Sequence, residues 1–305
     1  MPRGPHRPRG FFVGVPMLAS IFVAATLAAA PGIPWTRDYT KAFADAEEQR
    51  RPLLLFFRNN CGGGNIPTNP IAVGGPIEHQ EGLSPCDRMQ DDVWENPAIV
   101  TAAERYLPVI VDSGDQTLQV RYQAVRMPTT LVTDPWGNEV FRTTGYLERD
   151  KMARILGALP RDFTPLAPAG QTLKANPIDF GALVSAARFY EGASLPQVSD
   201  RLYAAALVAP GATDVPARRQ AVISRGLLLM SRLNRAEEAA SLFEKELAAA
   251  PDGPGSDALL LGLVNARLTQ GKRKEAEAAV KQMESRFAAS PYTARAKENL
   301  AGARK

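Results

Sequence analysis

The sequence predicts two folded parts, an α/β domain with a mixed sheet flanked by helices and then an all-α helical-repeat domain. A chain of 305 residues exceeds one ordinary compact domain and suits two. From Trp35 to about Pro160, continuous apolar segments alternate with helical patterns. Beyond Pro177 the composition shifts to alanine, leucine and charged residues at helical spacing. These observations place an alternating strand and helix region before a purely helical one.

The composition is that of a folded globular protein. Apolar residues make up 45% and charged residues 22%, which excludes wholesale disorder and a multi-span membrane protein. The net charge of +4 falls to +1 without the first 30 residues, which contain three arginines and no acid. The remainder has no dense stripe of lysine and arginine interleaved with aromatics. We therefore expect no nucleic-acid partner.

Residues 1–30 are predicted as a signal peptide or an N-terminal membrane anchor. A basic stretch precedes an apolar segment from Phe11 to Ala30, which ends in small residues. Because residues 11–30 are long enough to span a bilayer as a helix, cleavage and inner-membrane anchorage are both open. In either case the rest of the chain lies outside the cytoplasm. The predicted location is the periplasm or cell envelope.

The first half of the α/β domain is predicted as helix, strand, loop and helix. The segment from Thr40 to Arg50 has a helical apolar pattern, and Leu53 to Phe57 is a strand buried on both faces. A loop rich in Gly, Pro and Asn follows from Asn59 to Ser84, a length typical of a functional segment. Ser84 then caps a helix that Pro85 opens and that continues to about Trp94.

The second half of the domain is predicted as a helix, three strands and a closing helix. These are a helix from Asn96 to before Leu107, strands Val109 to Val111, Thr129 to Thr133 and Glu139 to Thr143, and a helix from Asp150 to Leu159. A turn at Asp134 to Asn138 joins the last two strands. A parallel pair with a helical crossover followed by a hairpin gives a mixed sheet.

The C-terminal part contains repeated helical segments. Residues 161–176 contain Pro165 and Pro168 and lie between Pro160 and Pro177, so they are predicted as a linker. In 177–305, the segments 234–251 and 271–291 are similar to each other, and 192–210 is a weaker copy. Helix pairs with a period in the high thirties resemble tetratricopeptide repeats, although the consensus aromatics of the first helix are missing.

The chain has two cysteines, Cys61 and Cys86. An even number in an oxidising compartment favours a disulfide between them. The strand Leu53 to Phe57 leads into Cys61, Pro85 and Cys86 open a helix, and Met127-Pro128-Thr129 precedes a strand. With these motifs, residues 34–160 resemble the thioredoxin superfamily, especially its exported members. The resemblance implies a cis peptide bond before Pro128, opposite the cysteines.

The typical Cys-Gly-Pro-Cys motif of that family is split in this chain. Cys61-Gly62 and Pro85-Cys86 are its two halves, separated by an insertion at residues 63–84. The resemblance implies that Cys61 attacks and Cys86 resolves the mixed disulfide. The start of a helix favours a thiolate, so the helix argument alone makes Cys86 the more acidic thiol. The sequence leaves this order open.

Two functions fit these features. The first is an envelope thiol-disulfide oxidoreductase in which Cys61, Cys86 and Pro128 act on protein clients or redox partner proteins. The alternative is a non-enzymatic scaffold that binds protein partners through its helical repeats. Its structural disulfide closes a loop of about 26 residues and contributes roughly 3 to 4 kcal/mol.

No cofactor or metal is expected. The chain has no Gly-rich dinucleotide motif, phosphate-binding loop or Gly-x-Ser-x-Gly elbow. A metal site would use His79 with Glu78, Glu81 and the two cysteines, but the short spacing of a specific metal site is missing. We interpret His79 as a solvated loop residue.

Overall fold

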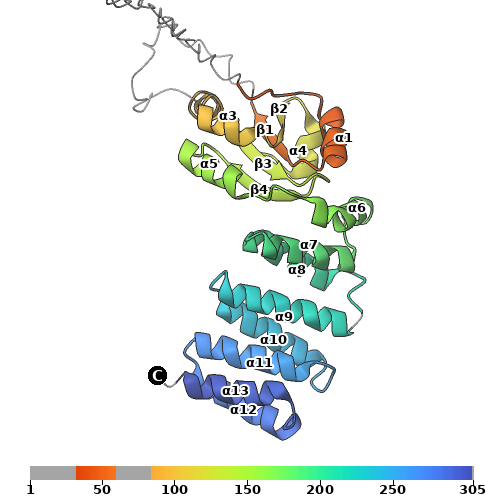
Figure 1. Ribbon diagram of the computed structural model, residues 1–305, viewed down its shortest axis with the longest axis vertical. Helices are drawn as coiled ribbons and strands as arrows, with labels where there is room; N and C mark the ends of the chain where they lie inside the picture. Colours follow the sequence, from red (N-terminus) through yellow and green to blue (C-terminus); the bar gives the residue numbers. More distant parts are fainter. Residues whose placement is uncertain (1–31, 60–83, 214, 304–305) are drawn as a thin grey trace, which may run out of the picture. The chain divides into compact units, whose positions relative to one another are not determined.

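The computed structural model describes residues 32–59, 84–213 and 215–303, all within one compact unit. The N-terminal part consists of four strands and the helices that pack on them (Figure 1). Its elements are α1 (Tyr39–Gln49), β1 (Leu53–Arg58), α2 (Pro85–Arg88), the π-helix η1 (Met89–Trp94), α3 (Pro97–Ala103), β2 (Leu107–Asp112), α4 (Gln116–Tyr122), β3 (Thr129–Thr133), β4 (Glu139–Thr144) and α5 (Arg149–Ala158).

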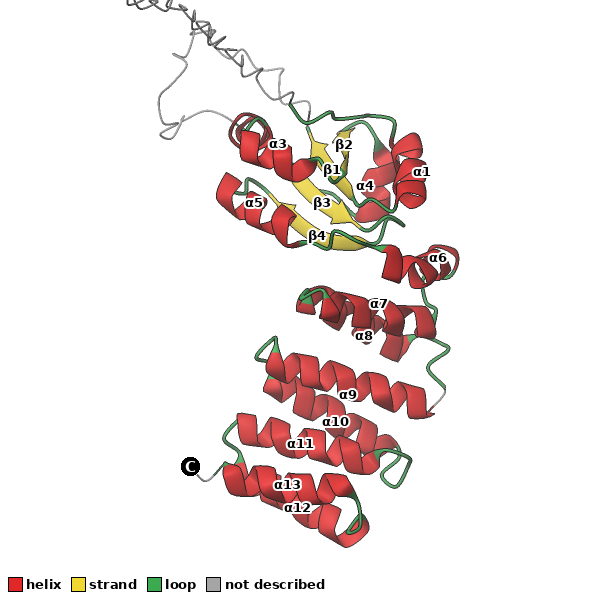
Figure 2. Cartoon of the chain, in the orientation of Figure 1, coloured by secondary structure: helices red, strands yellow, loops and turns green. Residues whose placement is uncertain are grey.

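The four strands form one mixed sheet in the order β2-β1-β3-β4. Strand β1 is parallel to β2 and antiparallel to β3, and β3 and β4 form an antiparallel hairpin. Figure 2 shows the sheet between two groups of helices. The predicted α/β domain with a mixed sheet flanked by helices is confirmed.

The alternation of side chains along β1 explains why both faces of the sheet are covered. Leu54 and Phe56 are fully buried with apolar residues of η1, α3 and α5. Leu53, Leu55 and Phe57 are fully buried on the other face with residues of α1 and α4. A strand buried on both faces has a continuous apolar sequence, as predicted for this segment.

Helix α4 was not predicted from the sequence. Asp115 caps it by accepting a hydrogen bond from Thr117 N at 3.0 Å. Its apolar residues Leu118, Val120 and Tyr122 are spaced by two positions, which is a strand period rather than a helix period. Val120 is 76% exposed, so only part of this pattern reflects burial.

Residues 161–176, predicted as a linker, instead contain the 3-10 helix η2 (Thr164–Leu166) and α6 (Ala167–Ala175). Phe163, Leu166 and Leu173 are buried in the main apolar core. Two of the prolines that suggested a linker, Pro165 and Pro168, stand in the first turns of these helices. A proline there removes no helical hydrogen bond, because the N–H groups of the first turn have no partner within the helix.

The C-terminal part is entirely helical among its described residues, as predicted. Each of its helices packs against the next one along the chain. The helices are α7 (Phe180–Gly192), α8 (Pro196–Val208), α9 (Val215–Ser231), α10 (Ala236–Ala249), α11 (Ser256–Thr269), α12 (Arg273–Arg286) and α13 (Pro291–Gly302). The three similar segments of the sequence fall on α8, α10 and α12, while the tetratricopeptide type of the repeat stays a prediction.

No described helix is long and apolar enough to cross a membrane, and residues 1–30 lie outside the described part.

The sheet and the helical region share buried contacts. The buried indole of Trp136, on the β3–β4 turn, packs directly over Gly170 of α6, and a Cβ at that glycine would overlap the ring. The carboxylate of Asp134, on the same turn, accepts a hydrogen bond of 3.3 Å from the hydroxyl of Tyr190 in α7. Arg201 of α8 pairs with Glu139 at 3.3 Å. One core therefore continues from the sheet into the helices.

Candidate functional site

The start of β3 lies beside the end of β1, where the chain leads toward Cys61. Phe57 pairs with Thr129 across the two strands. The peptide bond between Met127 and Pro128 is cis, which confirms the expectation from the family resemblance. Pro128 is buried immediately before the paired Thr129. The cis-proline loop is thus adjacent to the strand end that precedes Cys61.

Cys86 lies in the first turn of α2 and is 5% exposed. The side chain of Ser84 caps this helix by accepting a hydrogen bond from Asp87 N at 3.2 Å, and Pro85 occupies the first turn. The helix continues directly into η1, whose Trp94 packs edge-on against Phe56 of β1 with ring centroids 5.4 Å apart. The sheet therefore fixes the position of η1, into which the helix that carries Cys86 continues.

Residues 145–147 connect the cis-proline loop to the helix that bears Cys86. Gly145 N donates a hydrogen bond of 2.8 Å to the carbonyl of Pro128. Leu147 N donates to the sulfur of Met89 at 3.3 Å. Between them, Tyr146 contacts two residues of α2 and η1, Arg88 and Asp92. The structure therefore brings Cys86 and Pro128, two of the three predicted site residues, onto segments attached to the same short bridge.

The C-terminal ends of β1 and β2 carry a cluster of charged groups. Asp112 accepts hydrogen bonds from Arg37 at 2.8 Å and from Arg58 at 2.9 Å. Burial raises the pKa of Asp112, but the bonds from Arg37 and Arg58 outweigh it and hold the pKa below its usual value. Two guanidinium groups thus share one carboxylate at this end of the sheet.

Cys61 lies outside the described residues, as do Glu78, His79 and Glu81. The Cys61–Cys86 disulfide and the metal alternative therefore stay predictions. The described residues contain no group of three or more histidine, cysteine, aspartate or glutamate side chains that could hold a metal ion.

The site includes residues to which sequence reasoning gave no role. Arg88, Asp92 and Tyr146 were each visible near a motif, but the contacts between them join positions 54 or more residues apart. The only signal in the sequence was the Gly145-Tyr146 pair after the last strand, which fitted the family resemblance without indicating a partner.

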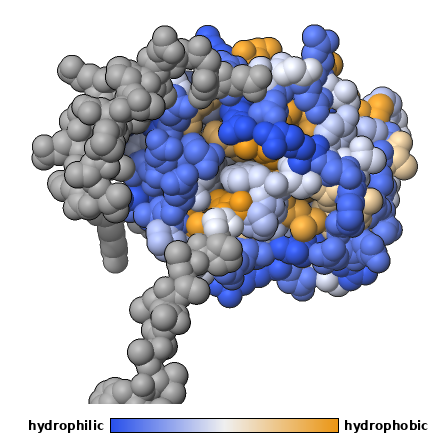
Figure 3. Space-filling model, turned by 90° about the horizontal axis from the view of Figure 1, so that it is seen from above, coloured by the Kyte–Doolittle hydropathy of each residue, from blue (hydrophilic) through white to orange (hydrophobic). Residues whose placement is uncertain are grey.

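The end of the molecule that carries the sheet has separate apolar patches between hydrophilic areas (Figure 3). Two of its exposed apolar side chains, Val120 and Val125, are 76% and 87% exposed. Val125 lies three residues before Pro128. A partner that approaches the cis-proline loop therefore meets apolar surface.

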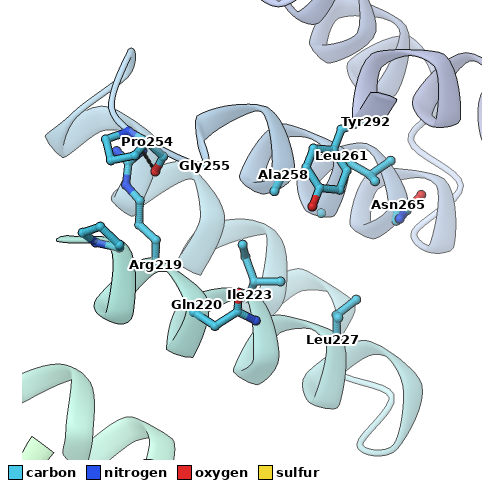
Figure 4. A pocket seen from close by; sticks show the side chains of 12 residues that line it. Arg219, Gln220, Ile223, Leu227, Pro254, Gly255, Ala258, Leu261, Asn265 and Tyr292 are labelled. Carbon is cyan, nitrogen blue, oxygen red and sulfur yellow. Dashed lines mark hydrogen bonds between the residues drawn. The ribbon is translucent and has the colours of Figure 1, made fainter. Parts of the chain in front are cut away.

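A second concave surface lies in the helical region, between α9, α11 and α13 (Figure 4). It has a volume of about 390 Å³ and is lined largely by apolar side chains. At one end, the buried Arg219 donates hydrogen bonds of 2.8 Å to the carbonyl of Pro254 and to Ser256 Oγ. These bonds hold the loop between α10 and α11, so Arg219 has a structural role at the edge of the pocket.

A family model agrees with the observed fold of the N-terminal part. The family model of the thioredoxin-like domain matches residues 39–160. Among solved structures, one described as DsbH oxidoreductase is similar at 17% identity and a TM-score of 0.32, covering 42% of this chain and 85% of that one. A thioredoxin from Thermus thermophilus is similar at 19% identity and a TM-score of 0.31, covering 42% and 86%. No curated protein sequence matches the chain. Residues 39–160 are therefore a thioredoxin-like domain, and a region of helices follows it.

Proposed function

We propose that the protein is a thiol-disulfide oxidoreductase of the cell envelope, which exchanges a Cys61/Cys86 dithiol and disulfide with protein clients. The observation that carries this proposal is the position of Cys86 in the first turn of a helix that a three-residue bridge joins to the cis-Pro128 loop. The matching family model supports a fold suited to this chemistry.

The exchange takes place in two displacement steps. The Cys61 thiolate attacks a client disulfide, which forms a mixed disulfide and releases one client thiolate that takes up a proton. The Cys86 thiolate then attacks Cys61 Sγ, forming the Cys61–Cys86 disulfide and releasing the second client thiolate. The client gains two electrons and the protein loses two. The reverse sequence oxidises the client.

The burial of Cys86 supports this order of attack. A thiol that is 5% exposed is poorly accessible to the disulfide of another protein. An intramolecular attack on a mixed disulfide at Cys61 requires no such access. We therefore assign Cys61 as the attacking and Cys86 as the resolving cysteine, although the start of the helix also favours a thiolate at Cys86.

Replacing each cysteine by serine tests the assignment. Cys86→Ser is expected to accumulate mixed disulfides with envelope proteins through Cys61, because the resolving thiol is missing. Cys61→Ser and the double variant are expected to trap few or none. The measurement is non-reducing electrophoresis of full-length protein after acid quenching. Strong trapping by Cys61→Ser alone would reverse the two roles.

The low exposure of Cys86 also favours the alternative, a scaffold with a structural disulfide. In that case the pocket between α9, α11 and α13 is a surface for a protein partner. The reduction potential separates the two functions. A value in the range of known exchange catalysts, about −120 to −270 mV, supports the oxidoreductase, while a value below about −300 mV supports the structural disulfide.

The envelope location rests on the sequence of residues 1–30 and is tested separately. A reporter fused after residue 40 is expected to be active only when it must fold outside the cytoplasm, because a basic start and a long apolar segment direct export. A cytoplasmic reporter fused at the same position is the control. Activity of that control alone would contradict the envelope location.

A further inference from the structure

Tyr146 has two separate contacts with the helical segment that follows Cys86. The guanidinium of Arg88 lies over the tyrosine ring at 4.0 Å from its centroid. The tyrosine hydroxyl donates a hydrogen bond to the carboxylate of Asp92. Arg88 is two residues and Asp92 six residues after Cys86, so Tyr146 contacts successive turns of the helix that carries the thiol.

The other side of this bridge is attached to the cis-proline loop. The hydrogen bond from Gly145 N to the carbonyl of Pro128 and the pairing of Thr144 with Thr129 fix residues 144 and 145 to the start of β3. The hydroxyls of Thr129 and Thr144 are also 3.2 Å apart. Tyr146 follows directly, so its position is set by the loop that contains Pro128.

The capping bonds of α2 do not attach it to the sheet. Ser84 accepts from Asp87 N and donates from its hydroxyl to the Asp87 carboxylate at 2.7 Å, and both bonds lie within the helix. By contrast, the contacts of Arg88 and Asp92 with Tyr146 join the helix to another part of the chain. Loss of these contacts therefore gives the first turn more freedom to shift relative to the cis-proline loop.

The charges around Tyr146 keep its hydroxyl a donor. Burial raises the pKa of Tyr146, and the hydrogen bond to Asp92 raises it further. Asp92 also pairs with Arg149 of α5 at 3.7 Å. The phenol thus stays protonated near neutral pH, and the Asp92 carboxylate accepts its hydrogen bond while forming an ion pair with Arg149.

We propose that Tyr146 is a positioning residue for Cys86: through Arg88 and Asp92 it holds the helix that carries the resolving thiol at a fixed place relative to the cis-Pro128 loop. This inference rests on the proposed thiol-disulfide exchange. It assigns the residue to the second displacement, in which Cys86 Sγ must align with the disulfide at Cys61. The first displacement does not use Cys86.

The two displacements can be measured separately in the reduced full-length protein with the aromatic disulfide DTNB as oxidant. Cys61 thiolate attacks DTNB and releases one thionitrobenzoate, and Cys86 thiolate then attacks Cys61 Sγ and releases a second. The two thiol protons pass to solvent. The rates of the first and second release report on attack and resolution. The variants are Tyr146→Phe, Asp92→Asn and their combination, with Tyr292→Phe on α13 as the matched control.

Tyr146→Phe retains the ring beneath Arg88 and removes the hydroxyl that donates to Asp92. We expect it to slow the second release about 5- to 10-fold, within the range of one ordinary hydrogen bond at a partly exposed site, and to leave the first release unchanged. Asp92→Asn keeps an amide oxygen that can accept from the tyrosine but removes the negative charge, so we expect a smaller slowing of the second release. In the combined variant the slowing should be less than the product of the two single effects, because both substitutions act on the same contact. Tyr292→Phe should match the wild type.

Three results would overturn the inference. Unchanged rates of second release in Tyr146→Phe and Asp92→Asn would show that the bond does not act on resolution. Equal slowing of both releases would indicate a merely structural role. Release of only one thionitrobenzoate by the wild type would instead disprove the proposed exchange itself, and the positioning role with it. The two substitutions change different partners of the same hydrogen bond. If one variant fails to fold, the other still tests the inference.

Discussion

Replacing Trp136 by alanine is expected to lower the free energy of unfolding by about 3 to 5 kcal/mol, the range for large aromatic residues removed from a core. The indole is 5% exposed and fills the space above Gly170, between the β3–β4 turn and α6. Its removal leaves a cavity where the sheet meets the helical region. Chemical denaturation monitored by circular dichroism measures the loss.

A pair of glycine substitutions provides the matched control for this site. A Cβ at Gly170 would overlap the indole, whereas a Cβ at Gly157 in α5 would meet no atom within 4 Å. Gly170→Ala should therefore cost about 1 to 3 kcal/mol, and Gly157→Ala should stabilise the protein by up to about 1 kcal/mol. Equal effects of the two substitutions would contradict the close packing of Trp136 on α6.

The second expected result is a loss of stability between about pH 4 and pH 6 that depends on Asp134. Its carboxylate is buried and accepts bonds of 2.9 Å from Trp136 N, Asn138 N and Asn138 Nδ2. Burial raises the pKa of Asp134 to about 6 despite these bonds. The folded state therefore keeps a proton that the unfolded chain, with a carboxyl pKa near 3.8, has already released. Where the folded state binds more protons, stability falls as pH rises.

The difference between the two pKa values corresponds to about 3 kcal/mol. The contribution of protonated Asp134 to the free energy of unfolding is fully present below about pH 4 and lost above about pH 6. Denaturation midpoints measured across this range in wild type and Asp134→Asn test it, with Asp150→Asn, whose side chain is 90% exposed, as control. The Asp134→Asn variant should lack this component of the pH dependence. Identical pH profiles for all three proteins would contradict the raised pKa.

The elements with strong local signals could be predicted from the sequence. Strand β3 has the predicted bounds, and Ser84 and Pro85 start α2 as their capping preferences require. The π-helix η1 could not be predicted, because its bond from Glu95 N to the carbonyl of Gln90 reflects one extra residue in a turn. Apolar periodicity does not distinguish such a turn from an α-helical one.

The candidate site could be predicted only as far as its motifs. Cys86 and Pro128 were identified because a helix start and a residue pair before a strand are local patterns. The contact of Tyr146 with Arg88 and Asp92 depends on how β4 and α5 lie against η1, which is tertiary information. The linker prediction failed for a related reason, since prolines mark helix starts as readily as irregular segments.

The contact of Trp136 and Asp134 with α6 and α7 limits how the protein can be divided. The matched family region ends at residue 160, but the residues that complete its core continue to Tyr190. A truncation at residue 160 would remove Gly170 from beneath the indole and the tyrosine hydroxyl from the carboxylate. For chimeras, a cassette cut at the family boundary would have an incomplete core, and the transferred module must include α6 and α7.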